Sequence, residues 1–93
     1  MRVSVFFDAV FSRVTGTSQV QVEVGEATLK GLLAALSSRF GDGLKEALLT
    51  ADGSRLAPGL TVLQEGRPLL LESPLKGEGE VAFLMAVAGG QGG

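Results

Sequence analysis

The sequence of 93 residues contains no cysteine and no histidine. Without thiols there is no disulfide framework and no cysteine nucleophile, and without an imidazole there is no Ser-His pair. A zinc site built from Cys and His ligands is excluded for the same reason. Any chemistry that involves this chain therefore has to use carboxylates, backbone groups or the chain ends.

Basic residues are outnumbered, because eight Lys and Arg stand against ten Asp and Glu and the net charge is −2. No basic run is present that could neutralise a line of phosphates, so no nucleic-acid partner is expected. The longest apolar run, Val81 to Ala88, is far shorter than the roughly 20 residues that a membrane span requires. Since the first residues read as a strand and not as an apolar leader, the sequence predicts a cytoplasmic protein without membrane association.

The length and a hydrophobic content of 45% predict one compact domain. We expect this domain to cover residues 1–88 and a flexible Gly-rich tail to follow at residues 89–93. At the start, Val3, Val5 and Phe7 alternate with polar residues and with Phe6, which predicts a strand over residues 1–7.

The next segments predict a hairpin and a helix. Residues 8–13 are expected to form an irregular loop, followed by a second strand over residues 20–24. Thr28 is suited to cap a helix and Gly41 to end it. One apolar stripe runs along this helix: Leu29, Leu32, Leu33, Leu36 and Phe40. A short further helical turn is predicted at residues 44–49.

Three more strands are predicted after the helix. Residues 60–63 and 69–71 flank a turn, and Pro68, which has no N–H to donate, is suited to a sheet edge. Residues 81–87 are apolar on both faces and predict a central strand. The order of elements favours an α+β fold of the β-grasp (ubiquitin-like) type, a mixed sheet with parallel first and last strands and one main helix on one face.

The segment after the central strand is rich in glycine: Ala88-Gly89-Gly90-Gln91-Gly92-Gly93. Because glycine has no Cβ, we expect a thin segment that can enter a narrow cleft of another protein and present a terminal carboxylate. The alternative is a frayed end without function.

Residues 79–84 together with Val87-Ala88-Gly89-Gly90 resemble the end of the MoaD/ThiS family of ubiquitin-like sulfur carriers. Residues 5–9, the segment Val14-Thr15-Gly16-Thr17 and the leucine stripe resemble that family's first strand, hairpin and helix. The resemblance is greatest to the small subunit of molybdopterin synthase.

The resemblance implies a carrier and not an enzyme. In the family, an E1-like (MoeB-like) enzyme uses ATP to adenylate the terminal Gly, and a sulfur donor then converts it to a thiocarboxylate. The carrier itself holds no cofactor. Molybdopterin (molybdenum cofactor) synthesis through a MoaE-like large subunit is the expected destination, with cysteine, thiamine or tRNA thiolation as alternatives. A ubiquitin-like protein modifier and an inert interaction module are the other interpretations.

Two positions depart from the family pattern. Met85-Ala86 stands where the molybdopterin synthase small subunit commonly has Pro-Pro, and three residues follow the Gly89-Gly90 pair. Three extended residues move the carboxylate by about 10 Å. We expect Gly92-Gly93 to be the activated end, with Gly89-Gly90 as the alternative if a protease trims the chain.

An apolar outer sheet face is the predicted docking surface for the adenylating enzyme and the acceptor. Its residues are expected to be Phe6, Leu84 and Ala86, continued by Val87 and Ala88. The alternative is that loops cover this face and make it a second core. Glu78 and Glu80 are expected to be solvated turn residues or to pair with a partner, and Asp8, Asp42 and Asp52 are expected in separate turns without a catalytic pair.

Overall fold

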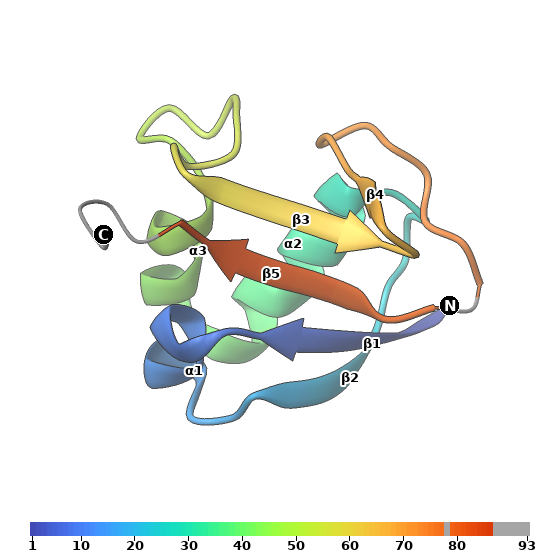
Figure 1. Ribbon diagram of the computed structural model, residues 1–93, viewed down its shortest axis with the longest axis horizontal. Coiled ribbons are helices and arrows are strands. Elements are labelled where there is room, and N and C mark those ends of the chain that lie inside the picture. Colours follow the sequence, from blue (N-terminus) through green and yellow to red (C-terminus); the bar gives the residue numbers. More distant parts are fainter. Residues whose placement is uncertain (78, 87–93) are drawn as a thin grey trace.

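The computed structural model describes residues 1–77 and 79–86 (Figure 1). In chain order the elements are β1 Arg2–Phe7, α1 Ala9–Thr15, β2 Gln19–Glu23, α2 Leu29–Phe40, α3 Asp42–Leu48, β3 Leu60–Gln64, β4 Arg67–Pro68 and β5 Val81–Met85. Within these two ranges, no helix is both long enough and apolar enough to cross a bilayer. The predicted boundary between a domain and a tail at residue 88 lies outside the described residues.

The strands form one mixed sheet in the order β2-β1-β5-β3-β4. The central strands β1 and β5 are parallel, whereas β1 with β2, β3 with β5 and β3 with β4 are antiparallel. Figure 1 shows α2 crossing behind the sheet, with α1 and α3 at the end where β5 finishes. The predicted β-grasp fold with parallel first and last strands is confirmed.

The core lies between the sheet and α2. The predicted alternation in β1 is confirmed, because Val3, Val5 and Phe7 are buried while Phe6 is only half-buried. Phe83 of β5 is fully buried, and its ring centroid lies 5.7 Å from that of Phe7. The four leucines of the α2 stripe are all buried: Leu29, Leu32, Leu33 and Leu36.

Helix α2 has the predicted ends. The Thr28 side chain accepts a hydrogen bond from the Gly31 N–H at 3.1 Å, and the Gly41 N–H donates to the Ser37 carbonyl. Helix α3 extends the short helical turn that was predicted at residues 44–49 toward the N-terminus. Its Leu44 and Leu48 complete the core beside α2.

The prediction of an irregular loop at residues 8–13 is wrong, because α1 occupies this segment. Asp8 caps the helix by accepting hydrogen bonds from the N–H groups of Val10 and Phe11, and Gly16 ends it. Phe11 is fully buried, with its ring centroid 6.5 Å from that of Phe83. A helix of seven residues is too short to show an apolar stripe, so only the capping residues reveal it.

The predicted strand at residues 69–71 is also wrong, because β4 consists of Arg67 and Pro68 alone. Leu69 still donates its N–H to the Val62 carbonyl, but the chain then turns toward the start of α2. There the carbonyl of Leu71 accepts the N–H of Lys30. Pro68 lies in the edge strand, as predicted. The first turn of α2, whose N–H groups have no partner within the helix, therefore takes the backbone acceptors that a strand would have used.

Candidate functional site

The face of the sheet that points away from α2 carries a row of apolar side chains. Because side chains alternate along a strand and Phe83 and Val62 point inward, their neighbours point outward. The pairing places these outward residues next to one another across four strands: Phe6 beside Ala82, Ala82 beside Leu63, and Leu63 beside Pro68. We call these four residues together with Leu84 the outer face.

The residues of the outer face are accessible in the described part of the chain. Phe6, Leu63, Ala82 and Leu84 are half-buried, and Pro68 is exposed. No described helix covers them, since Figure 1 shows β1, β5 and β3 in front and α2 behind. Phe6 and Leu84 therefore lie on one accessible apolar surface, and the alternative of a second core on this side does not hold for the described residues.

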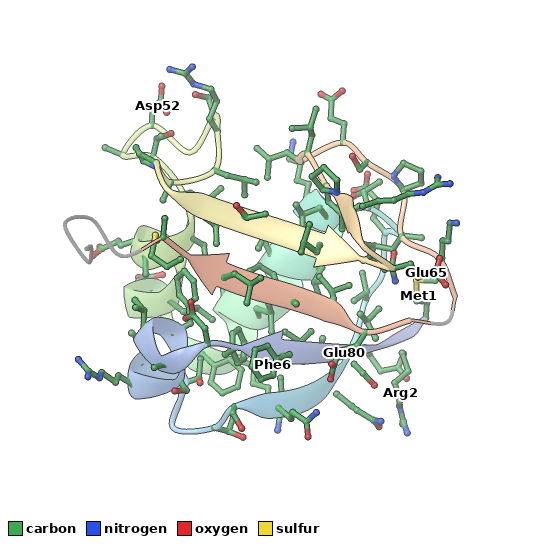
Figure 2. All side chains as sticks on the ribbon, in the orientation of Figure 1. Met1, Arg2, Phe6, Asp52, Glu65 and Glu80 are labelled. Atoms are coloured by element: carbon green, nitrogen blue, oxygen red, sulfur yellow. The ribbon has the colours of Figure 1, made fainter. Side chains whose placement is uncertain are left out.

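A polar border follows the outer face along β2. Gln21 donates to the Ser4 hydroxyl at 3.3 Å, and Gln19 donates to the Glu80 carboxylate at 3.1 Å. Figure 2 shows Glu80 beside β1, close to the β2 edge. The apolar surface is thus limited on one side by amide and hydroxyl groups and by the Glu80 carboxylate, and it extends from β1 toward β3 and β4.

The remaining predicted docking residues lie at or beyond the end of β5. Ala86 is exposed, and its N–H donates to the Gly59 carbonyl at 2.9 Å. Val87, Ala88, Gly89, Gly90, Gly92 and Gly93 lie outside the described residues, as does Glu78. The structure therefore places the strand that leads into the Gly-rich segment, and the Gly-rich segment stays a prediction from the sequence.

Helix α1 adds an apolar surface that the sequence did not indicate. Val10 and Val14 are 40% and 45% exposed. Because α1 begins directly after β1, it lies at the end of the sheet where β5 finishes, and these valines belong to that end of the molecule. The misassigned loop at residues 8–13 is the reason that they were missed.

The carboxylates of the described residues form no catalytic pair. Asp8 caps α1, and Asp52 accepts hydrogen bonds from Thr50 and Ser54 in the loop before β3. Hydrogen bonds from the Thr50 hydroxyl and from the N–H and hydroxyl of Ser54 lower the pKa of Asp52 from 3.8 to about 2. Among residues 1–77 and 79–86, no group of three or more acidic residues is placed to hold a metal ion.

No family model matches this sequence, and no curated protein matches it significantly. Solved structures do. SAMP1 from Haloferax volcanii is 27% identical with a TM-score of 0.83, and the match covers 96% of this chain and 99% of that one. A chain of the BexX/CysO complex from Amycolatopsis orientalis is 25% identical with a TM-score of 0.78, covering 94% and 98%.

A third solved structure is similar in fold. It is a putative molybdopterin converting factor, subunit 1, from Pyrococcus furiosus, 20% identical with a TM-score of 0.72 over 94% of this chain and 99% of that one. All three matches span nearly the whole chain on both sides. The resemblance to ubiquitin-like sulfur carriers of the MoaD/ThiS type is therefore confirmed, and this chain is similar to them over nearly its entire length.

Proposed function

We propose that this protein is a sulfur carrier whose C-terminal carboxylate is the reactive group. An E1-like enzyme joins that carboxylate to the AMP part of ATP and releases pyrophosphate. A sulfur donor then displaces AMP, and the product is a thiocarboxylate. The protein is the substrate of these steps, and ATP binds to the partner enzyme.

The observation that carries the proposal is the position of β5. It lies in the centre of the sheet between β1 and β3, and in the sequence only Ala86 and Val87 separate it from the segment Ala88-Gly89-Gly90-Gln91-Gly92-Gly93. A carboxylate becomes a good electrophile only after its oxygen has become a leaving group, and a glycine carbonyl leaves the attacking sulfur unhindered. The outer face adds an apolar surface on the same strand for a partner.

The proposed destination is molybdopterin synthesis, with a MoaE-like large subunit as the acceptor and a MoeB-like enzyme as the activator. Support for this branch comes from the fold shared with a molybdopterin converting factor subunit and from the resemblance of residues 79–84. Cysteine, thiamine or tRNA thiolation are the alternative destinations of the same thiocarboxylate.

A second candidate function is protein modification, in which the same carboxylate forms an isopeptide bond with a lysine. The observation that favours it is the similarity to SAMP1, because another solved structure of that Haloferax volcanii protein, 26% identical here, is described as small archaeal modifier protein 1. Both functions begin with the adenylate and differ in the nucleophile that follows.

Intact-mass spectrometry tests the proposal. The full chain is incubated with an E1-like enzyme, ATP and a sulfur donor, and we expect a mass increase equal to the difference between a sulfur and an oxygen atom. A ladder of conjugates to other proteins instead indicates a modifier. An unchanged mass with every activating enzyme of the source cell contradicts both functions.

Truncated chains show which glycine carries the carboxylate that is adenylated. A chain that lacks Gly92 and Gly93 is expected to form no adenylate, and a chain that ends at Gly90 is expected to be inactive as well. Full activity of the chain that ends at Gly90 would show that Gly89-Gly90 is the activated pair and that trimming precedes activation.

The outer face is tested by Leu84→Ser, with Leu70→Ser as the matched control. Leu70 is 73% exposed in the segment after β4 and does not belong to the outer face. Because apolar residues at the centre of an interface dominate its energy, Leu84→Ser is expected to raise the KM for the carrier in adenylation about tenfold. Leu70→Ser is expected to leave it unchanged, and equal effects of both variants would contradict docking through the outer face.

A further inference from the structure

The Asp8 carboxylate joins two parts of the chain at the end of β5. Its Oδ1 atom accepts hydrogen bonds from the N–H groups of Val10 at 3.0 Å and Phe11 at 3.3 Å, which caps α1. Its Oδ2 atom accepts a hydrogen bond from the N–H of Met85 at 2.6 Å. One side chain therefore holds both the start of α1 and the last residue of β5.

The second of these bonds replaces a missing bond of the sheet. In a parallel ladder, a residue that donates to one position of its neighbour accepts from the position two residues further on. The Asp8 N–H does donate to the Phe83 carbonyl at 3.1 Å, but the Asp8 carbonyl accepts the N–H of Ser12 inside α1. The Asp8 carbonyl is thus turned into α1, and the Met85 N–H donates to the Asp8 side chain in its place.

The other side of β5 is held by backbone. The Ala86 N–H donates to the Gly59 carbonyl at 2.9 Å, on the flank of β3. The N–H groups of Met85 and Ala86, the last two residues that the structure describes, are thus bound in opposite directions, one by Asp8 and one by Gly59. Loss of either bond frees the backbone at the point from which the segment starts.

We propose that Asp8 is a positioning residue for adenylation, because its bond to Met85 fixes the direction in which the chain leaves the sheet. This inference rests on the proposed function of the C-terminal carboxylate. A segment that starts from a fixed backbone loses less conformational freedom when it enters the partner's cleft than one that starts from a frayed strand. The effect is therefore expected in the KM for the carrier and not in kcat.

Asp8→Asn separates the two roles of the side chain. Asparagine is as good a helix cap as aspartate, so α1 keeps its first turn, but its amide nitrogen donates and cannot accept the Met85 N–H. Asp8→Ser is a second variant with the same logic, since serine caps helices and has a single side-chain oxygen. The matched control is Thr28→Ala, which removes the cap of α2 and leaves β5 untouched.

The test measures the steady-state kinetics of adenylation for each full-length chain with the E1-like enzyme and ATP, together with hydrogen exchange of the Met85 amide. For Asp8→Asn and Asp8→Ser we expect a KM about tenfold higher, an unchanged kcat and faster exchange at Met85. For Thr28→Ala we expect wild-type kinetics and slow exchange at Met85, although the cap is lost.

The outcomes separate the inference from the function on which it rests. Wild-type KM in both Asp8 variants, with fast exchange at Met85, overturns the positioning role and leaves the proposed function intact. An equal rise of KM in Thr28→Ala also overturns it, since general loss of stability then explains the effect. A wild-type chain that forms no adenylate overturns the proposed function and this inference together.

Discussion

At each end of the sheet one polar side chain makes three hydrogen bonds within a loop or to a loop, but the environments of these two side chains differ. At the end where β5 begins, Gln64 is 3% exposed and binds the loop at residues 76–79. At the end where β5 finishes, Asp52 is exposed and binds only Thr50 and Ser54 in its own loop. Burial and not the number of bonds decides how strongly each loop is held.

The same comparison can be made for the chain on either side of β5. Gln64 donates to the carbonyls of Lys76 and Gly79 and accepts the N–H of Lys76, so the chain entering β5 is held by a buried amide. The chain leaving β5 is held by the half-buried Asp8 carboxylate and by the carbonyl of the exposed Gly59. The two ends of β5 are therefore held differently: its start by one buried side chain, and its end by a carboxylate and a backbone carbonyl that come from two different segments.

The largest loss of stability is expected for Gln64→Ala. The variant leaves the Lys76 N–H and the Gly79 carbonyl without their partner in a partly buried place, and we expect a loss of about 2 kcal/mol in the free energy of unfolding. Urea denaturation measures it. The control is Gln19→Ala, whose exposed amide donates only to Glu80, with an expected change below about 0.5 kcal/mol. Equal losses of unfolding free energy in the two variants would contradict the conclusion that burial decides how strongly a loop is held.

A smaller effect is expected for Gly59→Ala at the opposite end. Gly59 has φ +83°, and an added Cβ would lie 3.3 Å from the Met85 sulfur. Gly53 has φ +74° with open space around it, so Gly53→Ala measures the backbone strain alone, about 1 kcal/mol. We expect Gly59→Ala to cost about 1–2 kcal/mol, because the Met85 side chain must also move.

The readout that distinguishes these two glycine variants is the Ala86 amide. Its NMR signal should shift in Gly59→Ala, since its acceptor is the Gly59 carbonyl, and stay unchanged in Gly53→Ala. An Ala86 signal that moves equally in both variants would show that the loop at residues 50–59 shifts as a unit, and that Gly59 does not hold the end of β5 individually.

The sequence predicted those elements whose formation depends on a short stretch of neighbouring residues. The alternation of Val3, Val5 and Phe7 predicted β1, and Thr28 with its leucine stripe predicted α2 to within a residue. The same alternation showed that Phe6 points away from the helix. The prediction that Leu84 lies on the same face had no such pattern behind it, because Leu84 and Phe83 are both apolar and only the pairing with β1 distinguishes them.

What the sequence did not predict depends on contacts between distant segments. The sequence assigns Gln64 to a turn, because the carbonyls that accept from its amide belong to the distant Lys76 and Gly79. The sequence assigns Asp8 to a loop, because the partner of its Oδ2 atom, Met85, is 77 positions away. A usable signal for α1 was present, since Asp8 and Gly16 bracket seven residues as a cap and a terminator, but the bond to β5 has no local signature.

The smallest effect is expected for Asp52, the exposed one of the two side chains compared above. All three hydrogen bonds reach Oδ1, so Asp52→Asn keeps the acceptor and removes only the charge. Since the pKa of Asp52 is lowered from 3.8 to about 2 in the folded protein, the ionised form stabilises the fold above pH 4, and this contribution is lost as the pH falls from about 4 to about 2. The difference in unfolding free energy between wild type and Asp52→Asn should therefore narrow over that range. Carbon-detected NMR titration of the Asp52 carboxyl gives the midpoint directly, and a midpoint near 3.8 would mean that these exposed hydrogen bonds do not hold the loop at residues 50–55 even locally.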